Sequence, residues 1–124
     1  THTFIWWYAI PSRLSQPARA SLNDPQQVRY LSAVSVWEMQ IKIQTGKLSI
    51  LPSLQTVVQQ HLEAGQVQLL PLKLEHIFTL NHLPTLPDHR DPFDRLLVAQ
   101  ALYEKLPMLS GDPLIAQYPI QIIW

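Results

Sequence analysis

The sequence contains no cysteine, only three glycines, and equal numbers of positive and negative side chains, nine of each. Without cysteine there are no disulfides, no thiolate catalysis and no cysteine-ligated zinc, and this composition fits the reducing cytoplasm, the location we expect. The balanced charge excludes a protein that is basic overall and binds nucleic acid for that reason; a nucleic acid has to meet a local patch or a metal ion. No apolar run approaches the roughly 20 residues that span a bilayer, and residues 1–4 lack the features of a signal peptide, so no membrane contact is expected.

The hydrophobic content and the pattern of predicted elements indicate a folded domain. Hydrophobic residues make up 47% of the 124 residues, which is enough for a sizeable core in one domain over residues 1–124. Predicted strands at 28–33, 67–70, 107–110 and 120–124 alternate with predicted helices at 14–22, 35–45, 52–63, 74–82 and after Asp91. This alternation predicts an α/β fold with three layers, in which helices cover both faces of a mostly parallel central sheet.

Residues 89–101, His-Arg-Asp-Pro-Phe-Asp-Arg-Leu-Leu-Val-Ala-Gln-Ala, are the most informative segment. Pro92 has no N–H to lose and suits the first position of a helix, which makes Asp91 the expected N-cap. Asp94 then lies on the first turn. From residue 96 to residue 102 only Gln100 is polar, so this helix is predicted to be buried on most sides.

Three carboxylates, Glu38, Asp94 and Asp112, stand at predicted strand-to-helix junctions, and Asp91 adjoins the second. Each has a structural alternative: Glu38 completes a capping box with Ser35, and the aspartates cap helices or favour helix dipoles. In a parallel α/β fold, however, these junctions lie at one edge of the sheet, where ligands gather. Converging carboxylates raise one another's pKa unless a cation intervenes, and oxygen ligands suit Mg²⁺ or Mn²⁺. The pattern therefore predicts metal-dependent phosphodiester hydrolysis.

Four segments in the same order carry a resemblance that covers essentially the whole chain: residues 1–7 (Thr-His-Thr-Phe-Ile-Trp-Trp), 35–38 (Ser-Val-Trp-Glu), 91–101 and 109–112 (Leu-Ser-Gly-Asp). In these the sequence resembles PIN-domain proteins of the group close to VapC-type toxin ribonucleases. The resemblance implies a ribonuclease whose Mg²⁺ or Mn²⁺ is held by three or four acidic residues. Glu38, Asp94 and Asp112 match that set, and Asp91 matches the group's recurrent motif as a further candidate ligand. It also implies neutralisation by a small antitoxin; the apolar N-terminal third is a candidate groove for that partner or for a homodimer face.

The same resemblance implies one more acidic residue, at the end of a first strand directly before the Thr1-His2 pair. That strand and its Asp are not in the sequence, so we expect a single PIN-like domain without its first strand. A degenerate PIN-like interaction module without catalysis is the alternative. A phosphoacceptor receiver domain is set aside, because Lys105-Leu106-Pro107 matches its Lys-Pro poorly.

Basic side chains flank the acidic motifs. Arg95 and Arg90 are the candidates for contacts with RNA phosphates. Lys42, four residues after Glu38, predicts an ordinary helix ion pair.

The histidines and tryptophans are interpreted as structural. The five histidines show no metal-ligand spacing; surface or capping roles are expected for His2 and His89, with an approach to the acidic edge as the alternative, and helix-surface positions for His61, His76 and His82. The tryptophans are expected in the core or at an interface, and no sequence feature supports base stacking by them: Trp6, Trp7, Trp37 and Trp124.

Overall fold

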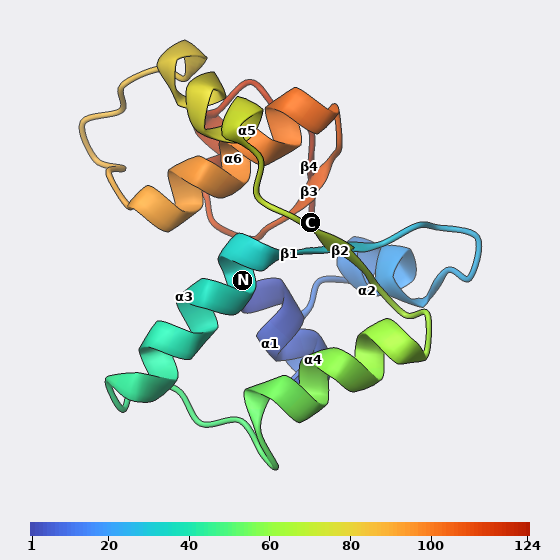
Figure 1. Cartoon of the computed structure of the whole chain (residues 1–124). Coiled ribbons are helices and arrows are strands. Elements are labelled where there is room, and N and C mark those ends of the chain that lie inside the picture. The colour runs from blue at the N-terminus through green and yellow to red at the C-terminus, as the bar shows by residue number, and fades with distance from the viewer.

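The computed structural model describes residues 1–124 and contains six α-helices and four short strands (Figure 1). The helices are α1 (His2–Ala9), α2 (Gln16–Asn23), α3 (Ala33–Gln44), α4 (Leu54–Glu63), α5 (Leu74–Thr79) and α6 (Pro92–Glu104). The strands are β1 (Tyr30–Ser32), β2 (Gln68–Leu70), β3 (Met108–Leu109) and β4 (Ile122–Ile123). Three single 3₁₀ turns complete the fold: Pro11–Arg13, Leu80–His82 and Ile115–Gln117.

The strands pair in parallel, which confirms the predicted α/β class. Tyr30 of β1 is in register with Gln68 of β2, and Met108 of β3 with Ile122 of β4. The strands form two separate pairs rather than one continuous sheet. A long crossover through α3 and α4 links the first pair, as parallel strands require.

The apolar core has two main parts, on either side of β1 and β2 (Figure 1). The first is built from α1, α3 and α4 with β1 and the residue before β2; its buried residues are Phe4, Leu31, Met39, Leu54, Val57, Val58 and Val67. The second surrounds α6; its buried residues are Leu83, Val98, Ala99, Ile115 and Tyr118. No helix is both long and apolar enough to cross a membrane.

Side-chain oxygens cap the starts of α2, α3, α4 and α6. Ser15 and Ser53 cap α2 and α4 through their side chains, and Gly46 and Gly65 follow α3 and α4 with positive φ, as helix stops do. The predicted capping box of Ser35 with Glu38 is wrong. Helix α3 begins earlier, and its N-cap is Ser32, whose hydroxyl accepts a hydrogen bond from the Val34 N–H at 3.0 Å.

Helix α6 is the element that the sequence predicts best. Asp91 is its N-cap, with its Oδ1 accepting the N–H of Asp94 at 2.9 Å, and Pro92 occupies the first turn. Residues 97–101 are buried, including Gln100 at 1% exposure. The helix does not follow a strand, however. It follows a loop with an antiparallel bridge between Leu86 and His89, so the predicted strand-to-helix junction at Asp94 is wrong.

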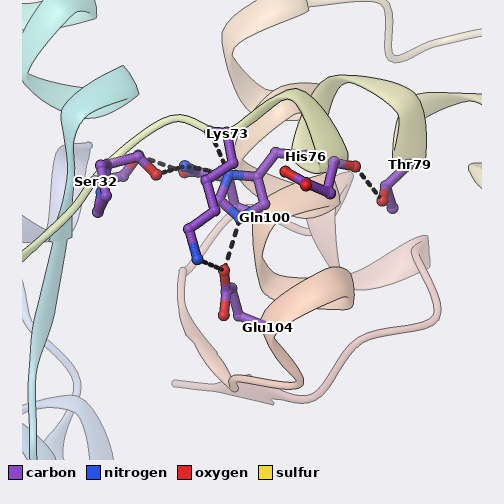
Figure 2. Close-up of polar contacts among 8 residues, drawn as sticks. Ser32, Lys73, His76, Thr79, Gln100 and Glu104 are labelled. Atoms are coloured by element: carbon purple, nitrogen blue, oxygen red, sulfur yellow. Dashed lines mark hydrogen bonds and ion pairs between the residues drawn. The ribbon is translucent and has the colours of Figure 1, made fainter.

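A buried polar network joins α3, α5 and α6 (Figure 2). His76 is fully buried, which corrects the predicted helix-surface position. Its Nδ1 accepts the backbone N–H of Lys73 at 3.1 Å, so its Nε2 carries the proton and donates to Glu104 at 2.8 Å. Gln100 lies 3.3 Å from the same Nδ1 and accepts a hydrogen bond from the hydroxyl of Ser32, the N-cap of α3. The network therefore links the two parts of the core.

Candidate metal centre

A cavity of about 650 Å³ lies where the end of β1 and the beginnings of α3 and α6 face the turn after β3. Four carboxylates line it: Glu38, Asp91, Asp94 and Asp112. The structure thus brings to one cavity every acidic residue that the sequence predicted for the site. Their role as metal ligands stays a prediction.

Asp94 is oriented by a chain of hydrogen bonds from residues distant in sequence. His89, whose side chain is 4% exposed, donates from Nε2 to the Asp94 carboxylate at 3.1 Å. The hydroxyl of Tyr118 lies 2.8 Å from Nδ1 of the same ring and donates to it, because the carboxylate fixes the proton on Nε2. Arg95 in turn donates to the Tyr118 oxygen at 3.0 Å. The predicted surface or capping role of His89 is therefore wrong.

Asp112 reaches the same point from the turn after β3. A ring nitrogen of His89 and one carboxylate oxygen each of Asp94 and Asp112 lie within 4.8 Å of one another. The Asp112 carboxylate also accepts the N–H of Leu114 at 2.9 Å, which fixes the turn. Its neighbour Gly111 has to be glycine, because a Cβ there would lie 2.6 Å from the Trp124 ring.

The charge of Asp94 is poorly compensated. Burial raises the pKa of its carboxyl above the ordinary value, and the charges of Asp91 and Glu38 raise it further. The hydrogen bond from His89 opposes these effects without overcoming them. A carboxylate in this setting gains from a nearby cation.

Glu38 has the opposite setting, although it is also buried. Burial opposes its charge, but hydrogen bonds from the Thr1 hydroxyl and from Lys42, together with nearby positive charge such as that of Lys42, outweigh that effect and hold the pKa of Glu38 below its ordinary value. The predicted ion pair with Lys42 is present, at 3.1 Å. Glu38 is thus kept ionised by the protein itself, at the wall of the cavity.

The donor set fits a divalent cation that prefers oxygen. Asp94 and Asp112 offer carboxylate oxygens from two different elements, and Mg²⁺ and Mn²⁺ favour such ligands over imidazole. His89 fits the role of an outer partner that orients Asp94, because its Nε2–H is used on that carboxylate. Asp91 fits the site less directly, since one of its oxygens caps α6.

The basic residues have structural contacts in this arrangement. Arg95 donates to the carbonyl of Pro84 at 3.0 Å as well as to Tyr118, and its guanidinium lies over the Tyr118 ring. Arg90 is exposed beside the α6 cap. Contact of either residue with RNA stays a prediction.

An α/β domain with carboxylates gathered at one cavity defines the class of a candidate metal-dependent phosphodiesterase. Residues 1–120 match the PIN domain family, and the chain belongs to that family. PIN domains are generally nucleases that depend on divalent metals. No curated protein and no solved structure matches the chain.

Proposed function

We propose that this PIN domain is a Mg²⁺- or Mn²⁺-dependent endoribonuclease and the toxin of a toxin–antitoxin pair. The observation that carries the proposal is the meeting of Asp94 and Asp112 within one cavity, with Glu38 on its wall and the pKa of Asp94 raised. These three residues would hold the ion, and His89 would orient Asp94.

The cation would supply a bound water of lowered pKa and neutralise charge on the phosphodiester. The protein's part is to fix the ligands. The Arg95–Tyr118–His89 chain holds the Asp94 carboxylate, the Asx turn holds Asp112, and Lys42 keeps Glu38 ionised. Because the ligands come from separate elements, they are placed by the fold rather than by a single loop.

Metal binding is tested by thermal melting. Mn²⁺ or Mg²⁺ is expected to raise the melting temperature, since a ligand bound only to the native state stabilises it. Asp94→Asn is expected to abolish that rise, whereas Glu63→Gln, which removes an exposed carboxylate from α4 outside the cavity, retains it. An equal rise in Asp94→Asn would remove Asp94 from the ligand set.

Hydrolysis is tested on single-stranded and loop-containing RNA. Cleavage is expected in Mg²⁺ or Mn²⁺ and is expected to stop in EDTA, with Glu38→Gln, Asp94→Asn and Asp112→Asn each losing most activity while staying folded. Full activity in EDTA would contradict the metal mechanism. An inactive, folded, partner-free protein would instead support the degenerate interaction module.

The partners and compartment belong to the same proposal. A small antitoxin and a second copy of the chain are the expected partners, and the cytoplasm is the expected location. Co-expression with the antitoxin encoded beside the toxin, followed by measurement of the mass of the complex and of cleavage before and after its removal, tests the pairing. A partner-free protein that is a monomer would overturn the expected homodimer.

A further inference from the structure

Trp37 is the most exposed tryptophan of the chain, and it lies on α3 beside Glu38, one of the carboxylates of the candidate metal centre. It is 55% exposed, although tryptophan is among the side chains that proteins bury most on average. It directly precedes Glu38 on α3, and Glu38 points into the cavity. A core position for this tryptophan is therefore wrong, and an interface position stays a prediction.

A second aromatic ring faces Trp37 from the other side of the site. Phe93 directly precedes Asp94 in the first turn of α6, and its ring centroid lies 4.9 Å from that of Trp37 at an interplanar angle of 70°. Helices α3 and α6 pack against each other, so this edge-to-face contact is fixed by the scaffold. Each ring of this aromatic pair thus directly precedes a carboxylate of the site in the sequence, Trp37 before Glu38 on α3 and Phe93 before Asp94 on α6.

We infer that the aromatic pair of Trp37 and Phe93 is a stacking platform for a nucleobase next to the scissile phosphate. The inference rests on the proposed function and names the part of the substrate that the carboxylates do not bind. A phosphodiester held at Asp94 would have its flanking bases near α3 and the start of α6, the two elements that carry the exposed indole and its partner ring. Every base has such a face, so stacking tolerates any sequence and favours single strands, whose bases are free to unstack.

The aromatic pair also supplies affinity for a nucleic acid that the charges of the site do not provide. The chain has no net charge and the cavity is lined by four carboxylates, so electrostatic attraction for a polyanion is weak. Stacking does not depend on charge and contributes to affinity at each base it engages. The pair therefore gives a neutral domain a means to retain a single-stranded nucleic acid.

The test compares two labelled single-stranded probes by fluorescence anisotropy. Both are 2′-O-methyl phosphorothioate oligonucleotides of the same length, and one is abasic, so they share their phosphates and differ only in bases. The wild-type protein is expected to bind the base-bearing probe about tenfold more tightly than the abasic one, the scale of one stacked base. Trp37→Leu is expected to bind both probes with the weaker affinity, and Trp37→Phe to keep part of the preference.

A matched control separates stacking from a general loss of exposed ring surface. Phe78 is 60% exposed and lies on α5, away from the carboxylates of the site in the sequence, and Phe78→Leu is expected to leave the preference unchanged. A preference that survives Trp37→Leu, or its absence in the wild type, would overturn the inference and point to a protein contact at this pair. Melting curves confirm that each variant is folded.

The outcome is distinguishable from that of the proposed function, because cleavage of unmodified RNA in Mn²⁺ is measured separately. Base preference without cleavage contradicts the nuclease but leaves the platform standing. Cleavage without base preference contradicts the platform alone. The absence of both contradicts the two together.

Discussion

The His76–Glu104 and His89–Asp94 pairs use the same kinds of side chain at similar distances, 2.8 and 3.1 Å, yet the two carboxyls have their pKa shifted in opposite directions. The hydrogen bond from His76, with help from Lys73, lowers the pKa of Glu104. Burial and neighbouring carboxylates raise the pKa of Asp94 despite its histidine. The charge of Glu104 is therefore compensated within the protein, whereas the charge of Asp94 is not.

The difference lies in what surrounds each pair. His76 is held by Gln100 and by the backbone of Lys73, so every polar group of that network has a partner within the protein (Figure 2). Asp94 instead faces a cavity that it shares with other acids. A network satisfied by the protein stabilises the fold, and a carboxylate lacking compensation marks a candidate functional site.

The largest expected effect is a loss of RNA cleavage when the carboxylate of the His89–Asp94 pair is changed. Asp94→Asn is expected to reduce metal-dependent RNA cleavage by more than about 100-fold, beyond the usual cost of losing only an outer partner of a ligand. Stability at neutral pH is expected to stay the same or to rise, because the change removes a charge that burial disfavours. Initial rates and denaturant unfolding of the same preparation measure both.

The stability gain of Asp94→Asn has a defined pH dependence. The folded-state pKa of Asp94 is raised, so its ionisation costs stability above that pKa, and the cost disappears as pH falls towards the ordinary aspartate value of about 3.9. The difference between wild type and variant is therefore expected to narrow in acid. A variant that is less stable at neutral pH would show that the Asp94 charge is needed by the fold.

The second effect concerns stability rather than activity. His76→Ala is expected to lower the free energy of unfolding by about 3 kcal/mol, because it opens a cavity and leaves the Lys73 N–H without its acceptor. His82→Ala, at an exposed position, is the matched control and is expected to change it by less than about 0.5 kcal/mol. Urea unfolding of both variants decides; equal effects would remove His76 from its structural role.

Local chemistry explains what the sequence predicted well. Asp91 followed by Pro92 specifies the start of α6 without reference to the rest of the chain, and the structure has that cap. The positions of all four strands were predicted within about two residues at each end, the usual uncertainty of such boundaries. The gathering of the carboxylates was also predicted, but its premise of one sheet edge is wrong: Glu38 and Asp112 follow strands of two separate pairs, and Asp94 follows a loop.

The burial of the histidines was beyond sequence reasoning for a physical reason. His89 depends on Tyr118, and His76 depends on Gln100 and Glu104, all more than 20 residues away. No local spacing reveals such partners. His89 does stand five residues before Asp94, inside the most informative segment, and that proximity was the one available indication.

The start of α3 shows how tertiary contacts decide between local alternatives. Ser32 and Ser35 are both capable caps by residue type. The hydroxyl of Ser32 also bonds Gln100 of α6, a contact that holds the chain at the end of β1 and begins the helix there. Residues 4–10 are similar: a short apolar run does not distinguish strand from helix, and packing forms α1 there.

The third expected effect is a pH-dependent loss of stability when the charge of Glu104 is removed. Glu104→Gln keeps an acceptor for His76 but removes the charge, and is expected to lower stability at neutral pH by about 1 kcal/mol or less. The folded-state pKa of Glu104 is lowered, so its contribution is present above the ordinary glutamate value of about 4.3 and is lost as pH falls through the folded-state pKa. The destabilisation caused by Glu104→Gln should therefore vanish in acid. Asp94→Asn is expected to change stability in the opposite direction, towards a gain at neutral pH. Urea unfolding of both variants across pH shows whether their stability changes have opposite signs. Changes of the same sign would contradict the contrast between the two carboxylates.

The smallest effect isolates the Lys73 side chain from its backbone. Its Nζ lies 3.4 Å from a Glu104 carboxylate oxygen, and its side chain is half exposed. Lys73→Ala is therefore expected to lower the free energy of unfolding by no more than about 0.5 kcal/mol. The backbone N–H at residue 73 still donates to His76 in the variant, which preserves the buried part of the network. High salt is expected to reduce the difference between wild type and variant, because exposed ion pairs are screened. Urea unfolding at low and high salt measures this. A large cost that salt does not change would mean that the ammonium group, rather than His76, completes the compensation of Glu104.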